Sequence, residues 1–209
     1  MSVPAVSPEQ ALAWVRWWVQ GARQAEADWA LGEQNVAAHC LAFLRSHSGP
    51  WLDAHLGMSA EWPATPNPVL LPLLSLDREQ WRRVLNLVAT VCAGSQTPQP
   101  PGLSQPELIW CRRLGKALQP GNWLPPTALA DTAEIRGLRL LRAWVGESVW
   151  SRLRLTFARS RVVDAERVSF ASLPGQRLTS LWQAVSWYAL TVPNEQGTPH
   201  VDSPLSDVQ

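Results

Sequence analysis

Hydrophobic residues recur at helical spacing along much of the chain, most clearly between residues 77 and 94. Apolar side chains there follow one another at intervals of three and four residues, which places them on one face of an α-helix. Asp77 and Gln80 form a capping pair ahead of this helix, and Gly94 lies just past its end. The expected core stripe is Trp81, Val84, Leu85, Val88 and Cys92.

The first helix is predicted to begin at Ser7. Ser7, Pro8 and Gln10 supply an N-cap, a proline at the first helical position and a capping-box partner. Trp17 points away from the apolar stripe of this helix, so either a neighbouring helix or a partner protein must cover it, and a neighbouring helix is favoured. The stripe is expected to continue through Ala11, Val15, Trp18, Ala22, Ala25 and Trp29.

Three other segments carry helix signals. One helix is expected from Val36 to Leu44, stopping near Gly49, with loop over residues 51–68. Another opens at the Ser104–Glu107 capping box and closes at residues 120–121, a Pro-Gly pair. The last follows the Pro-Gly turn at residues 174–175, and its stripe is Leu178, Trp182, Val185 and Ala189.

Residues 131–161 are the arginine-rich part of the chain, with seven arginines against two glutamates. A capping pair of Asp131 and Glu134 is expected to start a helix here, and Gly146 to end it. At 100° per residue, apolar side chains gather on one side of this helix and arginines on the other. The core side is Leu138, Leu141, Trp144 and Val145, and the cationic side is Arg136, Arg139 and Arg142.

Beyond Gly146 the hydrophobic phase resets, and two interpretations compete. A second helix would carry Val149, Trp150, Leu153 and Phe157 as its stripe, flanked by arginines. Residues 152–157 also alternate polar and apolar in the period of two that is typical of a strand. The helix is the favoured interpretation.

These elements predict a mainly α protein, a compact irregular multi-helix domain with minor strand content as an alternative at residues 152–157. Residues 1–192 are expected to form one helical domain, with the proline-rich run at 95–102 as a candidate internal boundary. The tail, residues 193–209, lacks apolar periodicity and is predicted to be disordered. No secretory signal or membrane-spanning run is apparent, so a cytoplasmic location is expected.

Composition narrows the functional classes. The chain has 209 residues, a formal charge of +1 and thirteen tryptophans, more indole than a core of this size needs. Exposed indoles are favoured at protein interfaces. A nucleic-acid binder using residues 136–161 is an alternative, although a charge so near zero argues against it.

Short catalytic and metal-binding motifs are absent from the sequence. His39, His47 and His55 lie eight residues apart, which does not suit a compact zinc site, and no cofactor is expected. An enzyme whose site is assembled from distant carboxylates is the less favoured alternative. Cys40, Cys92 and Cys111 are odd in number and widely spaced, which indicates buried thiols in a reducing compartment.

The arginine-rich segment has two interpretations of its own. The cationic side can be a solvated surface, which composition favours, or a docking surface, because guanidinium groups bind carboxylates bidentately and stack on aromatic rings. Indoles would then anchor the partner. The candidate partner-binding residues are Arg136, Arg139, Arg142, Arg152, Arg154, Trp17, Trp144 and Trp150.

Three stretches of this region form a recognisable series of Trp, Leu and Arg: residues 108–115 (LIWCRRLG), 138–146 (LRLLRAWVG) and 149–157 (VWSRLRLTF). The series resembles the SctK family of type III secretion systems, most nearly its YscK and PscK branch, with OrgA and MxiK as more distant counterparts. The resemblance is best over residues 108–163, is looser over the rest, and does not cover the tail.

The resemblance implies a non-enzymatic adaptor of the injectisome sorting platform. Such an adaptor would link pods built from an SctQ-type protein to the cytoplasmic domain of an SctD-type inner-membrane ring protein. SctL and the ATPase SctN would be indirect partners. The expected location is the cytoplasmic face of the inner membrane. The family offers no functional residues to transfer one by one, so docking through the arginines is a separate hypothesis.

Overall fold

The computed structural model describes residues 6–21, 25–29, 56–58, 61–93, 100–125, 131–168 and 173–192. Within these ranges every regular element is an α-helix or a 3-10 helix, and there is no strand. The prediction of a mainly α fold is confirmed. Among the described residues no helix is long and apolar enough to cross a membrane.

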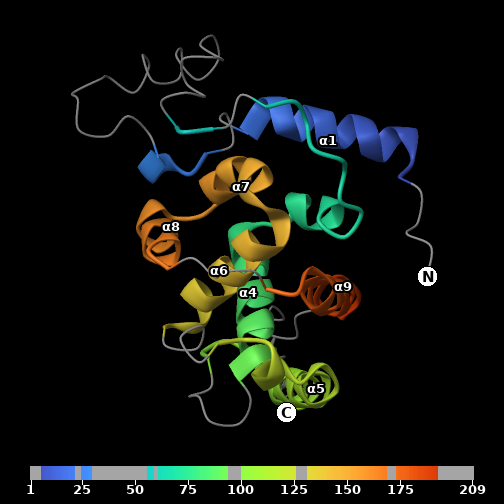
Figure 1. Ribbon diagram of the computed structural model, residues 1–209, viewed down its shortest axis with the longest axis vertical. Helices are drawn as coiled ribbons and strands as arrows, with labels where there is room; N and C mark the ends of the chain where they lie inside the picture. Colours follow the sequence, from blue (N-terminus) through green and yellow to red (C-terminus); the bar gives the residue numbers. More distant parts are fainter. Residues whose placement is uncertain are drawn as a thin grey trace, which may run out of the picture.

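Helix α4 (Arg78–Ala93) runs through the middle of the molecule (Figure 1). It packs directly against α5 (Gln105–Leu118), α6 (Ala133–Val145) and α9 (Gly175–Thr191). Contact on several sides buries almost every apolar side chain of α4, and the five-residue stripe predicted from its sequence is confirmed. Gly137 of α6 lies so close that an added Cβ would fall 2.7 Å from the carbonyl oxygen of Leu85.

Helix α1 (Pro8–Gln20) lies across one end of the molecule (Figure 1). Both hydrogen bonds of its predicted capping box are present. The predicted stripe is wrong in phase and length, because the helix ends at Gln20 and Val15 is 43% exposed. The buried face consists of Trp14, Trp17 and Trp18, three indoles that contact one another.

The segment after Gly146 is helical, as favoured. Helix α7 (Glu147–Leu153) is followed by a 3-10 turn, Arg154–Thr156, so the strand interpretation is wrong. The predicted stripe of Val149, Trp150, Leu153 and Phe157 is buried throughout. Helix α8 (Arg159–Glu166) was not predicted at all.

Helix α6 begins differently from the prediction. Its N-cap is Thr132, whose side chain accepts a hydrogen bond from the backbone N–H of Ile135. The predicted capping role of Asp131 is therefore wrong, since that carboxylate pairs with Arg139. The predicted end is confirmed, because Gly146 follows the last helical residue with φ of 78°, a conformation that favours glycine.

The elements predicted for residues 30–55, 94–99 and 193–209, including the helix after Val36 and the tail, lie outside the described residues, as do Ala22 and Cys40. One cluster of buried apolar side chains draws members from all seven described α-helices. The α5 capping box is confirmed, and the helix ends at Leu118, just before the Pro-Gly pair at residues 120–121 that was expected to close it. Cys92 and Cys111 are free and buried, as expected.

Candidate protein-docking site

The arginines of α6 do not form the exposed cationic face that the sequence predicts. Arg136 and Arg139 are each only 5% exposed, whereas Arg142 is half-buried. Helix α6 packs against α4 on one side and against α8 on another, so its polar side is enclosed as well. The prediction of a solvent-facing row of arginines is wrong for these two residues.

Arg139 and Arg142 instead close the C-terminal end of α8. Arg139 donates through Nε to the carbonyl oxygen of Ala165 at 3.3 Å and through Nη2 to that of Asp164 at 3.1 Å. Arg142 donates to the carbonyl oxygen of Glu166 at 3.4 Å. These carbonyls have no partner within the helix, and the helix dipole makes this end negative, so cations stabilise it.

Arg136 reaches two backbone carbonyls. Its Nη2 donates to the carbonyl oxygen of Asp131 at 2.9 Å, and its Nη1 lies 3.5 Å from that of Ala89 in α4. Burial lowers the pKa of Arg136, while the nearby Cys92 and Asp131 oppose that shift. A guanidinium keeps its proton under all ordinary conditions, so Arg136 is a buried cation that ties α6 to α4.

Arg152 and Arg154 of the next segment have similar structural partners. Arg152 donates from Nε to the carbonyl oxygen of Trp18 at 3.2 Å, closing the end of α1, and lies 3.9 Å from the Trp18 ring. Arg154 pairs with Glu166 at 3.2 Å and donates to the carbonyl oxygen of Leu56 at 2.6 Å. Both guanidinium groups therefore serve the fold.

The three candidate indoles are also largely internal. Trp17 is covered by its own domain, and the indole N–H of Trp150 donates to a carboxylate oxygen of Glu166 at 2.8 Å. Trp144 is half-buried and stacks on Trp182, with ring centroids 5.1 Å apart and planes at 9°. Of the predicted docking set, only Trp144, Arg142 and Arg154 keep partial exposure.

Internal pairing also bears on the nucleic-acid alternative. Phosphate contacts need free, surface-facing cations. Within residues 131–168, the side chains of Arg136, Arg139 and Arg152 are buried on carbonyls or carboxylates. Arg159 and Arg161 stay exposed on α8, and Arg161 lies 3.7 Å from Glu134. The arginines of α6 and α7 therefore do not form a basic surface for phosphate groups.

Helix α1 carries an exposed row of apolar side chains that the sequence prediction missed and that we call the α1 stripe. Leu12, Val15 and Val19 are spaced by three and four residues on the side of α1 away from its indoles, and all three are exposed. The prediction had assigned Val15 to the core. The size of the side chains was the signal that could have corrected it, because three indoles bury far more apolar area than alanine and valine.

A second exposed apolar group, the α9 pair, consists of Trp187 and Leu190. They lie one turn apart on α9 and are 64% and 45% exposed. Ile109 is exposed on α5, which contacts α9 through the stack of Trp110 on Tyr188 at 4.1 Å. Exposed tryptophan side chains are among those that contribute most to binding at protein interfaces, which makes Trp187 a candidate anchor.

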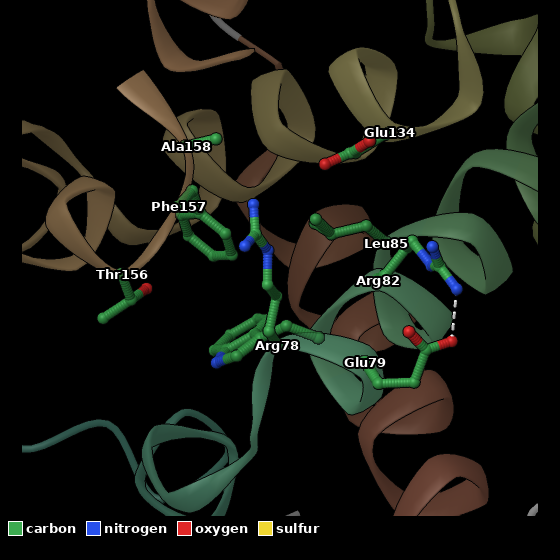
Figure 2. Close-up of a pocket in the computed structure, with 9 residues that line it drawn as sticks. Arg78, Glu79, Arg82, Leu85, Glu134, Thr156, Phe157 and Ala158 are labelled. Carbon is green, nitrogen blue, oxygen red and sulfur yellow. Dashed lines mark hydrogen bonds and ion pairs between the residues drawn. The ribbon is translucent and has the colours of Figure 1, made fainter. Parts of the chain in front are cut away.

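A small pocket opens beside the N-terminal turn of α4 (Figure 2). Its volume is about 80 Å³, and its walls come from α4, from α6 and from the turn at residues 156–158. Figure 2 shows the guanidinium group of Arg78, which lines the pocket, between Leu85 and Phe157, and the Glu134 carboxylate on the α6 side. The sequence prediction did not single out any of these residues.

Titratable groups in the core have structural roles. Burial raises the pKa of Cys92 and of Cys111 to about 12, so both thiols stay protonated and unreactive at neutral pH. Among the described residues, no group of three or more His, Cys, Asp or Glu side chains is arranged to hold a metal ion.

Glu107 and Arg83 form a buried ion pair between α5 and α4, with Arg83 Nε 2.6 Å from the carboxylate. Arg83 also donates to the carbonyl oxygens of Ala189 and Val192 at the end of α9. Burial alone would raise the pKa of Glu107. Hydrogen bonds from Ser104 and Arg83 outweigh it, so the pKa lies below its ordinary value.

Comparison with protein-family models, with curated proteins and with solved structures finds no match to this chain. The resemblance to the SctK family therefore stays a prediction.

Proposed function

We propose that this protein is a non-enzymatic adaptor of a type III secretion sorting platform, linking an SctQ-type pod protein to the cytoplasmic domain of an SctD-type ring protein. SctL and the ATPase SctN would be reached through the pod. The adaptor would work in the cytoplasm, at the inner face of the inner membrane.

The observation that carries the proposal is the presence of two exposed apolar groups on separate helices. The α1 stripe lies on the helix that crosses one end of the molecule, and the α9 pair on a helix along its side (Figure 1). An adaptor must hold two partners at once. Each contact needs a few apolar or aromatic anchors within a polar surround, which both groups supply.

Arg136, Arg139 and Arg152 do not belong to the proposed docking surface, because their side chains are buried on backbone carbonyls. The α1 stripe and the α9 pair take their place as the surfaces expected to bind the two partners.

The first test is a double substitution on α1, Val15→Glu with Val19→Glu, followed by co-purification with the SctD cytoplasmic domain and with SctQ. The matched control places the same two charges at Ala13 and Gln20, which are exposed beside the stripe. We expect the stripe variant to lose one partner and the control to keep both, with identical circular dichroism spectra.

The second test applies the same design to α9. Trp187→Glu with Leu190→Glu is expected to remove the other partner, whereas Gln176→Glu with Thr179→Glu, at exposed positions about two turns or more from Trp187, is expected to remove neither. The proposal is refuted if the unaltered chain binds neither protein. It is also refuted if the α1 double variant and the α9 double variant each bind both proteins as the unaltered chain does.

A further inference from the structure

The pocket beside α4 contains one cation that has no counterpart. Arg82 pairs with Glu79, and Arg161 lies 3.7 Å from Glu134. In the part of the chain that the structure describes, no carboxylate lies within ion-pair distance of Arg78. The two charges within each pair cancel, so Arg78 leaves the pocket with one unmatched positive charge.

The walls of the pocket strengthen whatever ion pair Arg78 makes. Leu85 and Phe157 lie on either side of its guanidinium group (Figure 2). Trp81 also lines the pocket and adds a third apolar side chain. Arg78 is itself exposed, and these apolar side chains lower the local dielectric only on the sides that they cover. An ion pair formed there is stronger than one on an open surface. Guanidinium also offers a planar pair of donors that matches the two oxygens of a carboxylate.

The size of the pocket limits its occupant. A volume of about 80 Å³ is enough for several water-sized groups, since one water needs roughly 10–15 Å³ of such space. Pockets for drug-sized ligands and cofactors are roughly 300–1,000 Å³. The space therefore fits a group about as large as one side chain.

The surrounding charges favour a carboxylate over a phosphate. Glu79 and Glu134 both line the pocket, and each is already matched by one arginine. A single negative charge would be balanced by Arg78. A phosphate group carries about −1.5 to −2 at neutral pH and would leave excess negative charge beside these two carboxylates.

We propose that this pocket binds a glutamate or aspartate side chain of a partner protein, and that Arg78 is the residue that binds it. The inference rests on the proposed function only in that the ligand belongs to another protein. This electrostatic contact would be the third binding surface of the adaptor. It would fix the orientation of a partner that apolar side chains hold elsewhere.

The test is a nuclear magnetic resonance titration of the full ¹⁵N-labelled chain with the capped tripeptide acetyl-Ala-Glu-Ala-amide. We expect saturable shifts of the Arg78 Nε–H and of the Trp81 indole N–H. The same peptide with glutamine, and sodium phosphate, are the comparison ligands. Arg78→Gln should weaken binding of the glutamate peptide by roughly fivefold or more, and Arg112→Gln, an exposed arginine on α5, should leave it unchanged.

One variant is expected to gain affinity. Glu79→Gln frees Arg82, which would then offer a second guanidinium group to the pocket and tighten binding of the glutamate peptide by roughly two- to fivefold. Equal shifts with the glutamine peptide, a response to phosphate alone, or unchanged affinity in Arg78→Gln would each overturn the inference. Because no secretion protein is used, the result is separate from that of the adaptor proposal.

Discussion

Replacing Arg139 with alanine tests whether the buried arginines hold the fold or bind a partner. The side chain of Arg139 is 4% exposed and donates to two carbonyl oxygens of α8 and to the carboxylate of Asp131. Arg139→Ala removes all three interactions and leaves Arg142 as the remaining arginine at that end of α8. A docking residue would show no such effect on stability.

The size of the effect follows from burial. Breaking a buried ion pair by removing one partner costs about 3–5 kcal/mol. The side chain of Asp131 is 35% exposed and can regain water, so we expect the lower end, about 3 kcal/mol. For a chain of this length each kcal/mol shifts the melting temperature by about 2–4 °C, which gives a decrease of roughly 6–12 °C.

Urea unfolding followed by circular dichroism measures this change, with Arg112→Ala as the matched control. Arg112 is exposed on α5, and we expect its removal to alter the free energy of unfolding by less than about 0.5 kcal/mol. The slope of free energy against urea should be the same in all three proteins. If Arg139→Ala unfolds at the same urea concentration as Arg112→Ala, the structural role assigned to the buried arginines is wrong.

Two further predictions concern the contacts of α4. The pKa of Glu107 is lowered in the folded state, so its contribution to stability is present above the ordinary glutamate pKa and is lost as pH falls through the folded-state pKa. Unfolding free energies measured across acidic pH should therefore converge for the unaltered chain and Glu107→Gln, and a constant difference would contradict this. Gly137→Ala should cost about 1–3 kcal/mol in urea unfolding, because its Cβ would fall 2.8 Å from the Leu85 Cβ, whereas Gly175→Ala, in open space, should be neutral.

Local signals predicted the helices whose capping residues lie next to them in the sequence. The capping boxes of α1 and α5 and the glycine after α6 involve residues within a few positions of one another, so a sequence contains all of the information. The stripe of α4 was predicted for a similar reason. One face of this helix is almost wholly apolar, so only that face can be expected to pack against the core.

Helix α8 could not be predicted because its ends are supplied by distant parts of the chain. A carboxylate oxygen of Asp28 accepts from the backbone N–H of Arg159 at 2.6 Å, and Arg139 and Arg142 bind the carbonyls at the other end. Only Val162 and Ala165 of this helix are buried. Eight residues with so little apolar content carry no periodic signal of their own.

The docking prediction failed at α6 because amphipathic patterns assume that a helix is buried on one side only. Packing by α4 and α8 encloses both sides of α6, which the pattern of leucine and arginine cannot express. Gly137 was the available clue, since a glycine within a helix often marks a close approach of another backbone. The pocket was missed because Arg78 and Glu134 are brought together only by tertiary packing.

The preference for arginine over lysine in this chain suits the way its basic side chains are used. Lys116 is the one lysine of the chain, whereas arginine side chains close the C-terminal ends of α1, α8 and α9. A guanidinium group can reach two or three carbonyls at once through donors in a fixed fork, which an ammonium group, a compact point charge, does less well. Such arginines are occupied by the fold, so the proposed partners would have to be held by side chains that the fold leaves exposed. The α1 stripe, the α9 pair and Arg78 meet that condition, and the residues of the original arginine hypothesis mostly do not.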